Sequence, residues 1–176
     1  MVRDIVIYPD KRLKEKSALV TEFNEELHQL LDDMYETMIA KNGIGLAAIQ
    51  VAVPKQVLII NIPLDIDTDD KEKSQPKENT LEVINPVFLE TSGKCKGQEG
   101  CLSVPKYFAD VDRFKYVKVK YQDRYGNEHI IEDDDFLSVA LQHENDHLLG
   151  KLFIEKLSIL KRKKFEKEWK KRVNKV

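Results

Sequence analysis

The sequence predicts an α+β fold in a single compact domain, and three observations support this. The chain has 176 residues, enough for one domain with a real core. Hydrophobic residues make up 41% of it, an ordinary value for a globular protein. Helix-like and strand-like stretches follow in the order helix, several strands, helix, helix, without the regular alternation of a parallel sheet. We expect one domain over residues 1–176, with antiparallel or mixed strands around a central helix.

Three helices are expected, over residues 21–41, 134–149 and 158–176. In the first, apolar residues recur at helical spacing, namely Phe23, Leu27, Leu30, Leu31, Met34 and Met38. Gly43 follows its end, and Gly150 follows the end of the second helix, as glycine commonly does. Three acidic residues precede the second helix and favour its start. The first and last helices therefore flank the strands at the two ends of the chain.

Strands are expected at residues 56–62, 81–89, 116–121 and 129–131. The third alternates apolar and lysine side chains, which is typical of a half-buried strand. Residues 123–127 supply the turn between the third and the fourth. Because Pro86 cannot donate a backbone hydrogen bond, we expect the strand that contains it to lie at a sheet edge.

The acidic and polar stretch at residues 64–79 is expected to form a mobile surface loop. Pro63 and Pro76 flank its most acidic part. Strand-like sequence resumes on both sides, so the stretch does not read as a linker between domains.

Charge and hydropathy restrict the range of partners. No apolar run approaches the roughly 20 residues that span a bilayer, and the first residues lack a signal-peptide core, so we expect a cytoplasmic protein with no membrane partner. The net charge of −2 predicts no sequence-specific binding to nucleic acid. Residues 161–175, however, hold nine Lys or Arg and two Glu, a local charge of +7. This basic end is a feature that the rest of the chain does not share.

The strongest chemical signal is the segment from Gln142 to His147. His143 and His147 are four residues apart, so on a helix they project from the same face and can share one metal ion. Glu144 is placed to handle the proton of a water molecule bound to that metal. Two unrelated histidines also reach this spacing by accident, so the pattern favours a metal site without proving one.

A catalytic site of this type needs a third protein ligand and one open position. A downstream glutamate is one candidate, and the chain offers Glu155, Glu166 and Glu168. The other candidate is Cys101, which follows Gly100 in a predicted turn. Such a turn is not a regular apolar stripe, so a purely structural role for this cysteine is less attractive. Cys95, between two lysines, looks exposed and incidental. The residues favour Cys101, and a metal-bound thiol would be deprotonated.

The segment from Gly43 to Gln50 is rich in small residues. Its two glycines allow another backbone, or a substrate, to approach closely. No strand precedes it and no third glycine follows, so it does not match a dinucleotide-binding fingerprint. Taken alone it is equally consistent with a helix end followed by a packed turn.

Together these segments resemble the peptide deformylase family. That family carries a glycine-rich segment ending in Gln, a Glu-Gly-Cys-Leu-Ser turn and a helix with Gln-His-Glu and Asp-His. In this chain they are residues 43–50, 99–103 and 142–147, in the same order. The opening Tyr8-Pro9-Asp10 is also similar, so the resemblance covers nearly the whole chain.

The resemblance implies a metal-dependent hydrolase. Cys101, His143 and His147 would bind one divalent metal, Fe(II) in the cell, with Zn(II) or Ni(II) able to replace it. The substrate would be the formyl-methionine terminus of nascent polypeptides, and formate would be released. Metal-bound hydroxide would attack the formyl carbon, with Glu144 as the general acid and base.

The resemblance also implies the groups that hold the substrate. Gln50 and the backbone N–H of Leu102 would donate to the oxyanion, and Gly45 would bind the peptide backbone. Candidates for the methionine pocket are Ile44, Val139 and Phe136.

Two parts of the chain depart from the family pattern or extend it. Lys106-Tyr107-Phe108-Ala109 lacks the glycine or arginine often found there, which puts substrate contacts on that side in doubt. The basic helix expected at 158–176 resembles the subtype with a C-terminal helix, which in relatives docks on the ribosome. A solvated charged helix is the competing interpretation of that segment.

Three other functions stay open at this point. A zinc endopeptidase would use the same helix with a glutamate as third ligand. A cysteine hydrolase would use Cys101 as nucleophile and His143 as base, which leaves Glu144 and His147 without roles. A ribosome-associated binding protein would keep the fold without the activity.

Overall fold

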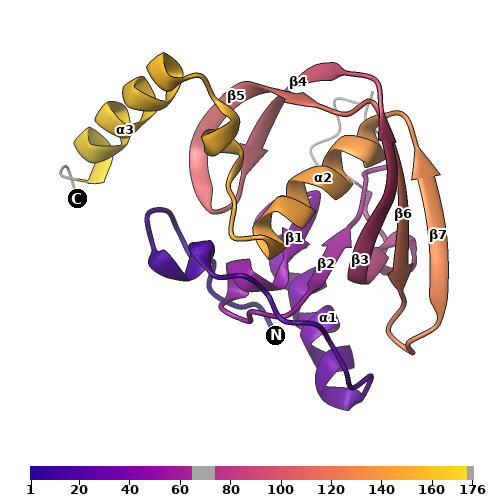
Figure 1. Cartoon of the computed structure of the whole chain (residues 1–176). Coiled ribbons are helices and arrows are strands. Elements are labelled where there is room, and N and C mark those ends of the chain that lie inside the picture. The colour runs from indigo at the N-terminus through magenta and orange to yellow at the C-terminus, as the bar shows by residue number, and fades with distance from the viewer. Residues whose placement is uncertain (65–73, 174–176) are drawn as a thin grey trace.

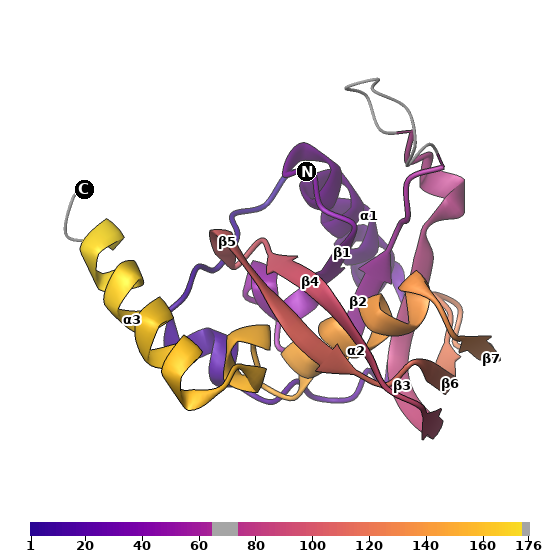
Figure 2. The same cartoon turned by 90° about the horizontal axis from the view of Figure 1, so that it is seen from above.

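The computed structural model describes residues 1–64 and 74–173 of the chain. The strands form one sheet of five and one of two. Figures 1 and 2 show helix α2 (Phe136–Leu148) at the centre of the molecule, between the two sheets. All strand pairs in both sheets are antiparallel. The α+β fold around a central helix is confirmed. Most of the expected loop at 64–79 lies outside the described residues, which resume at Ser74 and include a short 3-10 helix, Lys77–Asn79.

The five-stranded sheet has the order β1-β2-β3-β6-β7. Its strands are β1 (Gly45–Ala47), β2 (Val57–Ile60), β3 (Leu81–Ser92), β6 (Tyr116–Gln122) and β7 (Glu128–Asp133). Strand β2 is an uninterrupted apolar run because both of its faces are covered. Val57 and Ile59 pack toward helix α1 (Glu25–Ala40), whereas Leu58 and Ile60 pack toward α2. The sheet is therefore held between the two helices.

The expected edge position of the strand that contains Pro86 is wrong. Strand β3 pairs with both β2 and β6. The register shifts between Ile84 and Val87, so the residue without an N–H lies in an irregularity of the ladder. Asn85, at a φ of 51°, supports the bend with its side chain, which bonds the backbone N–H and C=O of Val20 at 2.9 Å each.

The two-stranded sheet was not expected from the sequence as a pair of strands. It consists of β4 (Cys95–Cys101) and β5 (Val104–Arg113), which are joined by a tight turn at Leu102 and Ser103. Gly97 and Gly100, and the charged residues of the outer face, obscure the alternation that marks a strand. The expected turn at Cys101 is present, and Cys101 is the last residue of β4 before it. Cys95 is half-buried rather than fully exposed.

The three expected helices are present, and each begins later in the sequence than expected. Helix α1 begins at Glu25 because the Asn24 side chain accepts a hydrogen bond from Leu27 N–H at 3.2 Å. At α2, the Asp133 carboxylate accepts from the N–H of Ser138 at 2.8 Å. Gly150, at a φ of 70°, follows the end of α2. Among the described residues, no helix combines the length and hydropathy that crossing a membrane requires.

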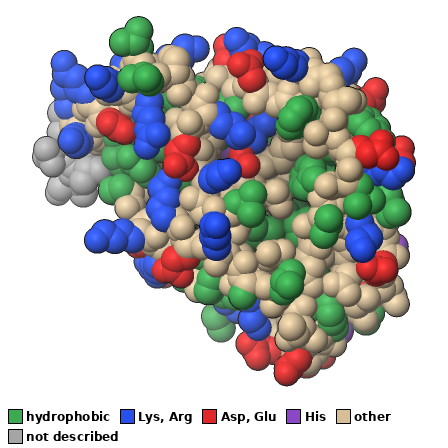
Figure 3. Space-filling view, viewed as in Figure 1, with side chains coloured by type: hydrophobic (Ala, Val, Ile, Leu, Met, Phe, Trp, Pro, Cys, Tyr) green, Lys and Arg blue, Asp and Glu red, His purple; other side chains and the backbone are tan. Residues whose placement is uncertain are grey.

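Helix α3 (Ile159–Val173) lies at one side of the molecule (Figure 1). An aromatic cluster attaches it to the rest of the fold. Phe165 and Trp169 are buried, and Phe165 packs against Tyr8 and Tyr107 with ring centroids 5.4 and 4.5 Å away. Lys and Arg side chains gather over this helix in Figure 3. The basic C-terminal segment is thus a helix anchored on its apolar side.

Candidate active site

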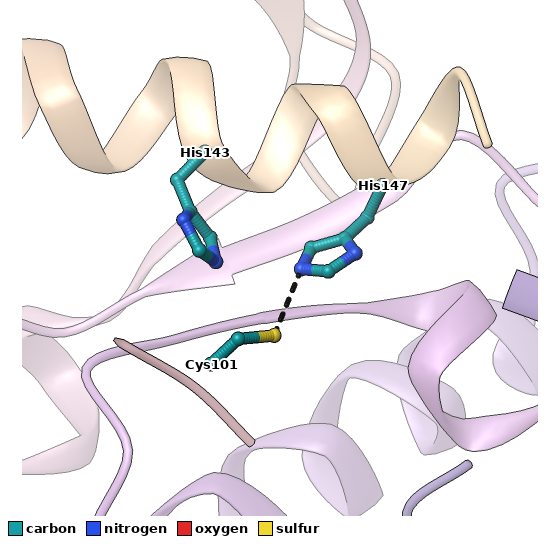
Figure 4. Close-up of side chains that lie close together, drawn as sticks. All are labelled: Cys101, His143 and His147. Atoms are coloured by element: carbon teal, nitrogen blue, oxygen red, sulfur yellow. Dashed lines mark hydrogen bonds between the residues drawn. The ribbon is translucent and has the colours of Figure 1, made fainter. Parts of the chain in front are cut away.

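Helix α2 and the end of strand β4 bring together the three residues of the expected metal site. His143 and His147 lie one turn apart on α2, and both imidazoles point toward Cys101 (Figure 4). The Cys101 Sγ and His147 Nε2 atoms are 3.4 Å apart. One ligand atom from each of the three residues lies within 4.8 Å of the other two. One ion can therefore be reached by all three side chains.

The donor set and its surroundings fit a transition metal. A thiol and two imidazoles are ligands that suit zinc, iron and nickel. The Nδ1 atom of His143 lies 2.8 Å from Glu99 Oε2, which leaves Nε2 as the nitrogen that faces the cysteine. Glu144 Oε2, beside the triad, is buried without a hydrogen-bond partner among the described residues. Such atoms are rare in folded proteins and occur where an ion or water belongs.

The glutamates considered as third ligands lie outside this group. Glu155 accepts a hydrogen bond from Leu152 N–H at 2.7 Å and pairs with Lys14. Glu166 pairs with Arg162 within α3, and Glu168 lies on the same helix. Within the part of the chain that the structure describes, the only group of metal-binding side chains is the one that contains Cys101. The geometry favours the cysteine as third ligand.

A buried ion network supports the site, and sequence reasoning missed its key member, Arg113. Its guanidinium donates to both carboxylate oxygens of Glu99, at 2.7 and 2.9 Å, and to Asp146 at 2.6 Å. Burial alone would raise the pKa of Glu99, but the hydrogen bonds with Arg113 and His143 outweigh it and lower the pKa to about 2. Glu99 therefore stays ionised and orients the His143 ring. No local pattern around Arg113 signals this role, because its partners are 14 and 33 residues away.

Without a metal, the pKa values of the two imidazoles shift in opposite directions. Burial disfavours the charged form of His143, but hydrogen bonds with Cys101 and Glu99 outweigh burial and raise its pKa well above the ordinary value. Burial and the nearby charge of His143 lower the pKa of His147. Metal ligation requires neutral imidazoles, so binding of a metal displaces the proton of His143.

Glu144 is buried beside the triad, with its carboxylate against Gly45. A Cβ at position 45 would overlap the Glu144 carboxylate, so only glycine allows this contact. Burial raises the pKa of Glu144 to about 7. A carboxyl group with such a pKa exists in both protonation states near neutral pH, which suits proton transfer.

The side chain of Gln50 is held in one orientation. Its Oε1 accepts a hydrogen bond from Ala47 N–H at 2.9 Å, so its amide N–H groups face the opposite way. Nε2 donates to Ser103 Oγ at 3.1 Å and lies 3.5 Å from Cys101 Sγ. These contacts direct an amide donor to the cysteine. Leu102 directly follows the cysteine in the turn.

The expected substrate residues lie on α2 and at the start of β1. Phe136 and Val139 precede His143 by seven and four residues on α2, so they continue the same helix face. Phe136 is 46% exposed. The backbone C=O of Ile44 is bonded to Asn61 N–H, toward β2, whereas Ala47 N–H points the other way, to Gln50. Because directions alternate along a strand, Gly45 presents its N–H and C=O to the open edge of β1.

Comparisons with known proteins agree with this arrangement. The family model described as polypeptide deformylase matches residues 2–163. A peptide deformylase of Nautilia profundicola is 59% identical over 170 residues, which is 97% of this chain and 94% of that protein. One of Campylobacter jejuni is 54% identical over 175 residues, which is 98% of this chain and 95% of that protein. The crystal structure of peptide deformylase from Ehrlichia chaffeensis superposes with a TM-score of 0.85 at 41% identity, over 98% of this chain and 97% of that one. The chain therefore belongs to the peptide deformylase family.

Proposed function

We propose that this peptide deformylase binds one divalent metal through Cys101, His143 and His147, with Fe(II) as the ion used in the cell. The enzyme removes the N-terminal formyl group from formyl-methionine of newly made polypeptides and releases formate. The observation that carries the residue assignment is the grouping of one thiol and two imidazoles beside a buried glutamate. Because the substrate is a nascent chain, we place the reaction in the cytoplasm, where polypeptides are made.

The residues around the triad divide the chemistry. When bound, the metal would act as a Lewis acid and lower the pKa of a water molecule. Glu144 would take a proton from the attacking water and pass it to the amine that leaves when the C–N bond of the formamide breaks. Gln50 Nε2 and the Leu102 N–H would donate to the oxyanion, at about 3–4 kcal/mol of transition-state stabilisation per donor. Their fixed orientation means that little rearrangement is needed during the reaction.

The open edge of β1 would hold the substrate. An extended peptide beside this edge can bond to Gly45, and the close approach of Glu144 to the same glycine places the general base next to the bound backbone. Ile44, Val139 and Phe136 would line the pocket for the methionine side chain. Because Val139 and Phe136 lie on the helix face of His143, that pocket would begin at the metal.

Metal exchange tests the proposal. Protein stripped by a chelator is reloaded with Fe(II), Ni(II) or Zn(II) without oxygen, and formate release from formyl-Met-Ala-Ser is measured with metal content. We expect no release from stripped protein and recovery on reloading, with Zn(II) slower than Fe(II). Air should inactivate the Fe(II) form faster than the Zn(II) form, because iron and its thiolate ligand are both oxidisable. Full activity of stripped protein would contradict a metal site, and equal rates for Fe(II) and Zn(II) would contradict the preference for iron.

We also propose that α3 contacts the ribosome through its exposed basic residues. Phe165 and Trp169 are buried, so deletion of the helix would also remove part of the core. Lys163, Lys167 and Lys170 are exposed, and replacing them by glutamine removes charge without touching that core. If all three contact RNA phosphates, the triple variant should bind ribosomes more weakly at low salt. The slope of log affinity against log salt should fall by about 2 to 3.

Co-sedimentation with ribosomes across a salt series measures this effect. The matched control replaces the exposed Lys41, Lys94 and Lys115, which follow α1, β3 and β5, by glutamine. A loss specific to the α3 variant supports the proposal, while equal binding by wild type and both variants would overturn it.

A further inference from the structure

The outer face of the β4–β5 sheet carries an exposed phenylalanine next to the active site. Phe108 is 63% exposed on β5, directly opposite Gly100 on β4. A Cβ at Gly100 would lie 2.5 Å from Phe108 Cε1, so the ring rests on the backbone of Gly100 itself. Gly100 immediately precedes Cys101. A large apolar surface therefore lies one residue from a proposed metal ligand.

The two faces of this sheet have different surroundings. Glu99 faces α2, where it bonds to His143, and Tyr107 packs on the same side against Phe153 and Phe165. Side chains alternate along a strand, so Gly100 and Phe108 face the other way. Asp110, two residues further along β5, is exposed on this outer face. Phe108 thus lies on the side of the sheet opposite α2.

Successive side chains of an extended substrate would point to opposite faces of the sheet that it joins. In the described part of the chain β4 pairs only with β5 and β1 only with β2, so each has one open edge. Strand β4 ends at Cys101, and Gly45 of β1 lies against Glu144. If the methionine side chain points to Val139 and Phe136 on α2, the side chain of the next residue points to the opposite face. Phe108 lies on that face.

We propose that Phe108 is a specificity-determining residue that contacts the side chain of the residue after formyl-methionine. Its ring favours a large apolar side chain at that second position, and the carboxylate of Asp110 disfavours an acidic one. The inference rests on the proposed function, because it assumes that the formyl group lies at the Cys101, His143 and His147 site.

The test compares kcat/KM for formyl-Met-Phe-Ser, formyl-Met-Ala-Ser and formyl-Met-Asp-Ser in wild type and in Phe108→Ala. Wild type is expected to prefer Phe over Ala at the second position, and Phe108→Ala should reduce that preference by roughly threefold to tenfold, the size of one aromatic contact. The loss on formyl-Met-Phe-Ser should exceed the loss on formyl-Met-Ala-Ser, and Phe108→Leu should restore part of the preference. The control Tyr125→Ala removes an aromatic ring that is 69% exposed in the turn between β6 and β7, and it should leave the preference unchanged.

The outcomes distinguish a failure of this proposal from a failure of the proposed function. An unchanged Phe-to-Ala ratio in Phe108→Ala, with wild type releasing formate normally, would overturn the role of Phe108 and leave the proposed function intact. An equal loss on all three peptides would show a structural role and would also overturn it. No formate from metal-loaded wild type would overturn the proposed function and this inference with it.

Discussion

Replacing Glu144 by glutamine is expected to lower kcat for formate release by about 10²- to 10⁴-fold, the usual contribution of a general acid or base. Glutamine has nearly the same size and shape, so it keeps the contact with Gly45. It has no carboxylate to accept a proton from water, so the loss falls on the chemical step. KM for the formyl peptide should change little, because the removed interaction acts in the transition state.

Metal analysis separates this loss from a loss of the site. Glu144 lies next to His143 in sequence, so each preparation must be shown to contain one metal per chain before its rate is compared. Glu78→Gln is the matched control, since Glu78 is exposed on the short helix Lys77–Asn79. If fully metal-loaded Glu144→Gln kept a rate close to that of the control, Glu144 would not be the general base, and the buried carboxyl group would need another role.

The metal ligands could be anticipated because their signal is local. His143 and His147 need only a helix to reach one ion, and the helical spacing of residues 134–149 predicted that helix. Cys101 is different, because it is 42 residues before His143 and no spacing rule links the two. Its turn after Gly100 favoured it over the downstream glutamates, the order of three motifs in the resemblance supported it, and the fold supplies the geometric reason by ending β4 opposite α2.

The support around the ligands could not be predicted from local patterns. Arg113 reaches Glu99 only because β4 and β5 pair in register, and reaches Asp146 only because α2 crosses that sheet. Both strands lack a clear apolar alternation, so neither the pair nor its register was visible in the sequence. The position of β3 was misjudged for a related reason. Pro86 argues for a sheet edge if a strand is regular, but the irregularity at Asn85 lets a central strand hold a proline.

Replacing Cys101 by serine is expected to abolish most metal binding and formate release together. A thiol becomes a much stronger ligand than a hydroxyl once it is deprotonated, and loss of even an outer partner of a metal ligand typically costs about 10- to 100-fold in metal affinity. We therefore expect a larger loss for Cys101→Ser, measured by competition with a chromophoric chelator. This variant also distinguishes the site from a zinc peptidase whose third ligand is a glutamate, which would keep both its metal and its activity.

Cys95→Ser provides a close control, because Cys95 is the other cysteine of the chain and begins the strand that Cys101 ends. Its thiol lies 3.7 Å from the C=O of Arg113 and 3.6 Å from that of Phe114, contacts that a hydroxyl can also make. Cys95→Ser should therefore keep wild-type metal content and activity. A cysteine hydrolase gives a third pattern, because Cys101→Ser would then lose activity without a change in metal content, and a chelator would not inhibit the wild-type protein. Joint loss of metal and formate release in Cys101→Ser alone assigns the thiol to the metal rather than to a nucleophile.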